Sequence, residues 1–145
     1  MKRRHRLRNR RDFAAVRQRR LVARSGPLRC HAAENRIGVA RVGFAIPGSS
    51  AGAVVRNRLR RRLRALLAVR LPALAALDVV VVTDQAAASL SAAELDAHLD
   101  HCLRTLRARL RASANVAGAA ETVVEDNGGV STAAPPESTL VPRPT

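Results

Sequence analysis

The residue types in this sequence that could do chemistry are concentrated at residues 53–64, which read AVVRNRLRRRLR. The segment holds six arginines, one asparagine and five apolar residues, and no acidic residue occurs between Glu34 and Asp78. Guanidinium groups match the geometry of phosphate oxygens, and an asparagine adds a directional donor and acceptor. A solvated helix face ordinarily mixes glutamate with arginine in i, i+4 pairs. The pattern therefore favours a surface that binds a polyanion.

A helix over residues 52–70 would position these side chains. At about 100° per residue, an apolar stripe forms one side of this helix and implies that it packs on a sheet. The stripe consists of Val55, Leu59, Leu63, Leu66 and Leu67. The opposite side gathers Asn57, Arg60, Arg61 and Arg64, while Arg56 and Arg62 flank the stripe.

The charge of the whole chain supports a nucleic-acid partner. The 145 residues carry a net charge of +15, with a pI near 11.9. Residues 1–70 contain 21 Lys or Arg against 2 acids, whereas residues 71–145 contain 5 against 9. We therefore expect the binding surface in the first half of the chain. A compositional bias towards arginine is the alternative explanation.

Groups that could make the polypeptide itself an enzyme are few. His98, His101 and Cys102 share one helix face as HxxHC, but Cys102 belongs to an apolar stripe and no fourth metal ligand is evident. No glycine-rich phosphate loop precedes a helix, and spacing alone supports no catalytic pairing. A metal-dependent nuclease is thus the weakest interpretation. We expect a reduced, cytoplasmic protein without a membrane span.

The remaining periodicity predicts a two-layer α+β sandwich in the order α-β-β-β-α-β-α. A short helix over 9–20 precedes about three strands within 21–46, the last over 37–46. After the arginine-rich helix come a buried strand at 78–84 and a helix at 91–110 with a Ser91–Glu94 capping box. We predict one domain over 1–111 and a disordered tail, rich in small residues and proline, over 112–145.

An ordered set of motifs resembles one family. GAVVRNRLRRRLR is similar to the signature helix of the bacterial ribonuclease P protein subunit. RLRNRRDF resembles the N-terminal Leu and Phe of that family, RIGVARVGFAI its Val-Gly-Phe strand, and DVVVVT its later strand. The similarity covers about residues 6–110. It implies a four-stranded sheet with helices on one face and a left-handed β-α-β crossover, as in ribosomal protein S5 domain 2-like folds.

The resemblance also implies a function. The family's subunit joins a catalytic RNA, and the holoenzyme removes the 5′ leader of precursor tRNA by hydrolysis assisted by Mg²⁺, bound mainly by the RNA. No membrane and no obligate protein partner are expected. By position, the RNA subunit would contact Arg56, Asn57, Arg58, Arg60, Arg61, Arg62 and Arg64. The leader would contact Phe13, Arg17 and Phe44, in a cleft between the first helix and the sheet.

Three departures from the family pattern stand out. Gly48, Ser49 and Gly52 replace basic loop positions, Arg17 falls near the place of a second aromatic residue, and Ala65 replaces a glutamate. The alternative from another class is a ribosomal or nucleoid protein that binds RNA or DNA through bulk charge.

Overall fold

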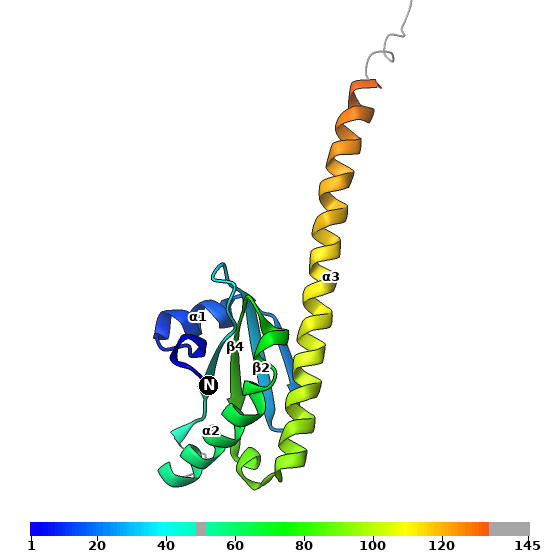
Figure 1. Cartoon of the computed structure of the whole chain (residues 1–145). Helices are drawn as coiled ribbons and strands as arrows, with labels where there is room; N and C mark the ends of the chain where they lie inside the picture. Colours follow the sequence, from blue (N-terminus) through cyan, green and yellow to red (C-terminus); the bar gives the residue numbers. More distant parts are fainter. Residues whose placement is uncertain (49–51, 134–145) are drawn as a thin grey trace, which may run out of the picture. The chain divides into compact units, whose positions relative to one another are not determined.

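The computed structural model describes residues 1–48 and 52–133, and its helices and strands follow the predicted order α-β-β-β-α-β-α (Figure 1). The α+β class and the four-stranded sheet are confirmed. Among the described residues, the 3-10 helix η1 (Arg3–His5) precedes these elements, while η3 (Leu71–Leu74) and η4 (Gln85–Ser89) lie between them. The helices are α1 (Arg10–Gln18), α2 (Ala53–Ala68) and α3 (Ala92–Ala133), and the strands are β1 (Val22–Ser25), β2 (Leu28–Glu34), β3 (Arg41–Ala45) and β4 (Leu77–Thr83).

The four strands form one sheet in the order β1-β2-β4-β3. β2 pairs antiparallel with β1 and with β4, whereas β3 and β4 are parallel. β3-α2-β4 is therefore a crossover unit, whose left-handed sense stays a prediction. β4 lies inside the sheet, and Val79, Val80 and Val81 are almost completely buried, as the run of valines predicts for a strand covered on both faces.

Helices α1 and α3 cover opposite faces of this sheet. Successive side chains of a strand point to opposite faces, so Ala33 and Cys30 on β2 face different ways. Ala33 joins Val80, Leu7 and Val16 in the cluster beneath α1. The helices therefore do not share one face, as the resemblance implied, because the apolar strand β4 exposes side chains on both faces that must be covered.

The face opposite α1 is closed by the first turns of α3. Leu95, Leu99, Cys102, Leu103 and Leu106 are buried there. The thiol of Cys102 lies 3.6 Å from the carbonyl oxygen of Ala23 on β1, and both cysteines of the chain are free and buried. A hydrogen bond with Cys102, together with burial, raises the pKa of the Cys30 thiol. Through its contacts with Ala23 on β1 and Cys30 on β2, Cys102 holds α3 against the antiparallel half of the sheet.

The predicted capping box at the start of α3 is present. Ser91 N donates to Glu94 Oε2 at 2.8 Å, and Glu94 N donates to Ser91 Oγ at 3.2 Å. Hydrogen bonds to the Glu94 carboxylate from the backbone and then from the side chain of Ser91 lower the pKa of Glu94. The helix runs to Ala133, past the predicted end at residue 110, and a second compact unit of the chain begins at Arg109. The alanine-rich composition after residue 112, which we read as a disordered tail, also has high helix propensity. Residues 134–145 of that tail lie outside the described residues.

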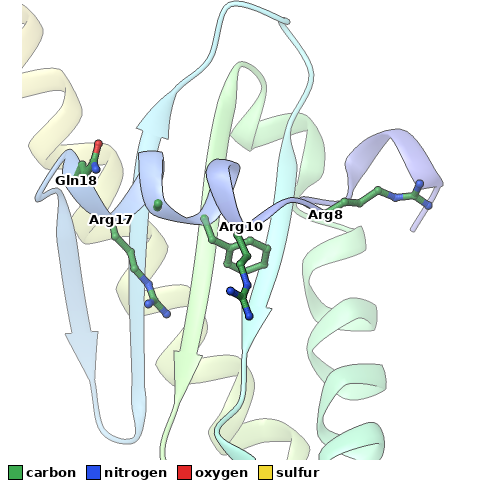
Figure 2. Close-up of a pocket in the computed structure, with 6 residues that line it drawn as sticks. Arg8, Arg10, Arg17 and Gln18 are labelled. Carbon is green, nitrogen blue, oxygen red and sulfur yellow. The ribbon is translucent and has the colours of Figure 1, made fainter.

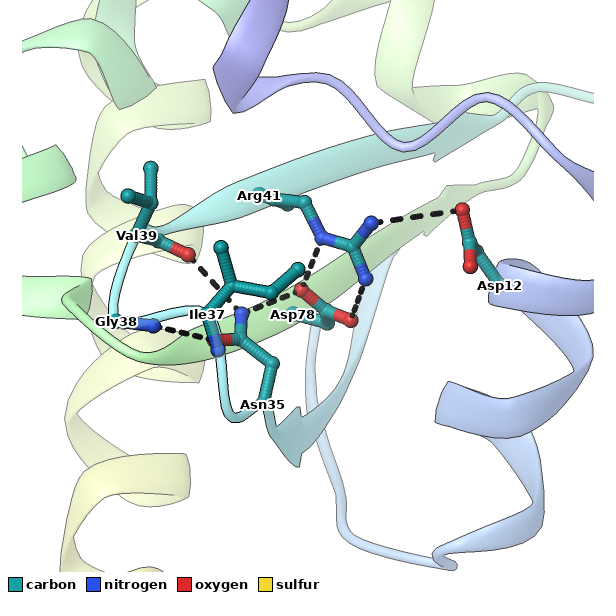
Figure 3. Close-up of polar contacts among 7 residues, drawn as sticks. All are labelled: Asp12, Asn35, Ile37, Gly38, Val39, Arg41 and Asp78. Carbon is teal, nitrogen blue, oxygen red and sulfur yellow. Dashed lines mark hydrogen bonds and ion pairs between the residues drawn. The ribbon is translucent and has the colours of Figure 1, made fainter.

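A buried acid organises the connection between β2, β3 and β4 (Figure 3). Asp78, at the start of β4, is 7% exposed and receives two hydrogen bonds from Arg41, at 2.9 and 2.6 Å. Asn35 donates to the same carboxylate at 2.7 Å. The Asn35 side chain also accepts from the backbone N–H groups of Ile37 and Gly38. Because this turn occupies the residues after Asn35, β3 begins only at Arg41. The prediction that this strand begins at residue 37 is therefore wrong.

Replacing Asp78 with alanine should lower the free energy of unfolding by about 3 kcal/mol, since Arg41 would keep a partly buried charge with only the more distant Asp12 beside it. Urea unfolding followed by circular dichroism measures the change. Glu34→Ala is the matched control, because Glu34 is exposed, and it should cost less than about 0.5 kcal/mol. Equal effects of the two substitutions would show that the buried pair is not a structural anchor.

Candidate nucleic-acid interface

Helix α2 presents its polar side as the sequence predicted. Leu59, Leu63 and Leu67 are buried at 3% exposure or less and fix the rotation of the helix. Asn57, Arg58 and Arg61 are exposed on the other side, and Arg61 makes no hydrogen bond or ion pair within the described part of the chain. The lack of an acid nearby leaves this side with an uncompensated positive potential, which attracts phosphate groups.

Three other arginines of α2 make internal contacts. Arg56 donates to the carbonyl of Gly48 at 3.0 Å, so it reaches back over the loop before the helix. Residues 49–51 of that loop lie outside the described residues. They include Ser49, one of the three positions at which this chain lacks a basic residue of the family pattern. Arg60 donates to Asn57 Oδ1 at 3.1 Å. Arg62 donates to the carbonyl of Leu90 at 2.6 Å and is half-buried, which ties α2 to the segment before α3.

The N-terminal segment and α2 together form a pocket at the edge of β3. Leu7 N donates to the carbonyl of Val42 at 3.0 Å, which places the segment along the free edge of this strand. The pocket has a volume of about 210 Å³ and contains four arginines and two phenylalanines. Its lining residues are Arg6, Leu7, Arg8, Phe13, Val42, Gly43, Phe44, Arg60 and Arg64. We call it the edge pocket.

Arg64 lies partly buried in the edge pocket. Its guanidinium carbon lies 6.0 Å from the centre of the Phe44 ring, at the outer limit of a cation–π contact. Its Nε is buried and has no hydrogen-bond partner among the described residues. Burial, followed by repulsion from Arg6 and Arg60, lowers the pKa of Arg64. An anion bound in the pocket would accept a hydrogen bond from Arg64 Nε. It would also offset the repulsion of Arg64 by Arg6 and Arg60.

A second pocket, of about 490 Å³, lies along α1 (Figure 2). Arg10 and Arg17 extend from the helix across the same side of the sheet, as Figure 2 shows. Phe13 lies against Gly43 of β3, where a Cβ atom would approach the Phe13 ring to 2.5 Å. The glycine therefore makes room for the ring. The lining residues of this α1 pocket are Arg8, Arg10, Phe13, Ala14, Arg17 and Gln18.

The three residues predicted to contact a leader are thus divided between the two pockets. Phe13 and Arg17 share the α1 pocket, while Phe13 and Phe44 share the edge pocket. Phe44 follows Gly43 in β3, so its side chain leaves the sheet on the face opposite Phe13. The two pockets meet at Arg8 and Phe13.

Sequence reasoning did not find Arg6 and Arg8 as members of this surface. They lie in a short basic segment without periodicity, and only its pairing with the edge of β3 brings them beside Arg60 and Arg64. The available signal was the density of arginine on both sides of Leu7, which indicates a positive charge but not where in the fold it lies.

The HxxHC residues do not converge. His98 Nδ1 lies 2.8 Å from Ser25 Oγ, Cys102 is buried against β1 and β2, and His101 is exposed. Within residues 1–48 and 52–133, no three His, Cys, Asp or Glu side chains are grouped so that they could hold a metal ion. The same part of the chain contains no helix with the length and apolarity needed to span a membrane.

The fold and these surfaces define a class: a strongly basic α+β protein whose arginines gather on one helix and in two adjoining pockets. Comparison with known families makes the assignment specific. The model of the family Ribonuclease P matches residues 1–107, and the chain belongs to this family.

Individual relatives agree with that assignment. The chain is 41% identical to the ribonuclease P protein component of Acidothermus cellulolyticus, over 71% of this chain and 88% of the relative. It is 39% identical to the corresponding protein of Streptomyces bikiniensis, over 70% of this chain and 91% of the relative.

Solved structures support the fold. A mutant RNase P protein of Staphylococcus aureus, described as defective in mRNA degradation, aligns with a TM-score of 0.64 and 22% identity, covering 71% of this chain and 88% of that one. The RNase P protein of Thermotoga maritima aligns with a TM-score of 0.59 and 20% identity, covering 65% and 90%.

Arginines on α2 should separate into structural and surface residues. Arg62→Ala should lower the free energy of unfolding by about 1.5–3 kcal/mol, because it removes a charged hydrogen bond to a part-buried carbonyl. Arg61→Ala should change it by less than about 0.5 kcal/mol, since its side chain is exposed. Urea unfolding of both variants tests the distinction, and a larger effect at Arg61 would contradict it.

Proposed function

We propose that this chain is the protein subunit of ribonuclease P, which takes part in removing the 5′ leader of precursor tRNA. Family membership supports the assignment, and the single structural observation that carries it is the continuous basic surface. That surface runs from the exposed side of α2 through the edge pocket to the α1 pocket. In this role, α2 binds the catalytic RNA, and the pockets bind the single-stranded leader.

The residue types fit this division. The exposed side of α2 presents rigid planar donors to a folded RNA, whose phosphates lie at fixed positions. The pockets combine arginines with the rings of Phe13 and Phe44, a combination suited to single strands because every base has a face that can stack. The two pockets meet at Phe13, so one strand can contact both.

Mg²⁺, bound mainly by the RNA subunit, supplies the hydrolytic chemistry when the holoenzyme is assembled. The residues of this chain bind and orient the two RNAs. Their arginines replace part of the cation atmosphere that otherwise screens phosphate repulsion, so less Mg²⁺ is needed for the two RNAs to associate.

Reconstitution tests the assignment. The purified chain, mixed with the ribonuclease P RNA of the same organism, should process precursor tRNA at a Mg²⁺ concentration where that RNA alone is inactive. The control is an unrelated protein of similar net charge. If that protein activates the RNA equally well, bulk charge explains the effect and the assignment fails.

Exposed arginines on α2 should carry the RNA-subunit contacts. The double variant Arg58→Ala, Arg61→Ala should weaken holoenzyme assembly and reduce the slope of log K against log salt by about two, one for each lost phosphate contact. Filter binding across a range of salt concentrations measures this slope. Arg107→Ala on α3 is the matched control, since Arg107 is also exposed, and it should leave the slope unchanged. Equal slopes for wild type and the double variant would remove this side of α2 from the interface.

A further inference from the structure

The two cysteines of this chain lie together on the face of the sheet that α3 covers. Cys30 on β2 and Cys102 on α3 are the only cysteines in the sequence, and both are free and completely buried. The edge pocket and the α1 pocket contain neither of them, so RNA binding gives no reason for thiols at these positions. Cysteine also serves as a small apolar core residue, so the placement of the two sulfur atoms has to indicate any chemistry.

The register of β1 and β2 places the two thiols side by side. Ala23 lies directly opposite Cys30, so both side chains leave the sheet on the same face. Cys102 Sγ lies 3.6 Å from the carbonyl oxygen of Ala23 and 3.9 Å from that of Leu28, which precedes Cys30 by two residues on the same face of β2. The Cys102 sulfur therefore lies over the strand pair where the Cys30 side chain projects, and the two thiols are hydrogen-bonded to each other.

A contact one turn earlier in α3 fixes the position of the helix along the hairpin. His98 precedes Cys102 by four residues and lies on the same side of α3. Its Nδ1 lies 2.8 Å from Oγ of Ser25, the last residue of β1. Gly26 follows with a φ of +54°, and a Cβ atom there would lie 2.6 Å from the His98 ring, so glycine permits this close approach. Helix and hairpin are thus held together beside the two thiols.

We propose that Cys30 and Cys102 form a reversible disulfide when the protein meets a two-electron oxidant such as hydrogen peroxide, and that this bond fastens α3 to the sheet. The sulfur atoms have to approach from hydrogen-bond contact to a bond length of about 2.05 Å. β1 is a four-residue strand at the edge of the sheet, so local opening of this edge can admit a small oxidant without global unfolding.

The reaction balances in two steps. The thiolate of Cys102 attacks one oxygen of the peroxide and the O–O bond breaks, which gives a sulfenic acid on Cys102 and a hydroxide that takes up the thiol proton as water. The sulfur of Cys30 then displaces the hydroxyl group, which leaves as a second water while the S–S bond forms. Cys102 reacts first because a hydrogen bond from the Cys30 side chain lowers its pKa, although burial opposes the shift, whereas the pKa of Cys30 is raised.

The disulfide closes a covalent loop from residue 30 to residue 102. This loop contains β3, α2 and β4, and therefore the arginine-rich helix whose positive charges are uncompensated. A cross-link over so long a segment lowers the entropy of the unfolded chain and stabilises the folded one. The bond itself lies away from the two pockets, so their arrangement should not change on oxidation.

Mass spectrometry of the full wild-type chain tests the bond without any substitution. The folded chain is treated with hydrogen peroxide below its melting temperature, then denatured, alkylated and digested with trypsin. We expect a monomer lighter by two hydrogen atoms and a cross-linked peptide pair that holds Cys30 and Cys102, both reversed by dithiothreitol. A treated chain that keeps two alkylatable thiols, carries added oxygen on sulfur, or forms only disulfide-linked dimers overturns the proposal.

Thermal unfolding measures whether the bond fastens the helix. The oxidised wild type should melt about 5–15 °C above the same protein treated with dithiothreitol. Cys30→Ala is the matched control, because it keeps Cys102 but cannot form the bond, and peroxide should not raise its melting temperature. An unchanged melting temperature of the oxidised wild type, or an equal rise in the control, would contradict the role of the bond. Both measurements are made without RNA, so their failure is distinct from a failure of the reconstitution assay.

Discussion

A carboxylate in the most buried strand of this protein requires a cation beside it, and the placement of Asp78 next to Arg41 meets this requirement. The pair joins β4 to β3. Asn35, in the turn after β2, donates a hydrogen bond to the Asp78 carboxylate, and the Asp12 carboxylate of α1 lies 3.6 Å from the Arg41 guanidinium. One ionic contact thereby links the parallel strands to the helix that crosses them. The positions of Phe13 and of the N-terminal arginines depend on that arrangement.

Apart from this anchor, the ion pairs of the described residues lie beside α3 and not on the basic surface. Arg70 pairs with Asp96 and Arg104 with Asp100 on the side of α3, so acids of the second half neutralise arginines there. Among the described residues, no ion pair reaches Arg61 or Arg64 on α2, or Arg24 and Arg29 on the β1–β2 hairpin. The resulting repulsion costs folding free energy and leaves a surface whose favourable partner is a polyanion. That separation is a physical basis for RNA binding in a small protein.

The order of elements and the outward side of α2 were predictable because both follow from local periodicity. Leucine spacing fixes which side of α2 is buried, and the valine run of β4 identifies a strand covered on both faces. The start of β3 was mispredicted because the Asn35 side chain caps the backbone of the following turn. That Phe13 lines both pockets while Arg17 and Phe44 line one each was missed as well, since it depends on which strand forms the sheet edge and which helix crosses it.

The sequence by itself determined a strongly basic first half, an acid-free arginine helix and the α-β-β-β-α-β-α order, because charge and periodicity are local properties of the chain. Only the tertiary structure decided how these charges are grouped. Pairing of the N-terminal segment with β3 brings Arg6 beside Arg64, and the β1–β2 register sets Arg24 against Arg29. These contacts join residues distant in sequence, and their energies depend on burial and separation, which no local pattern encodes.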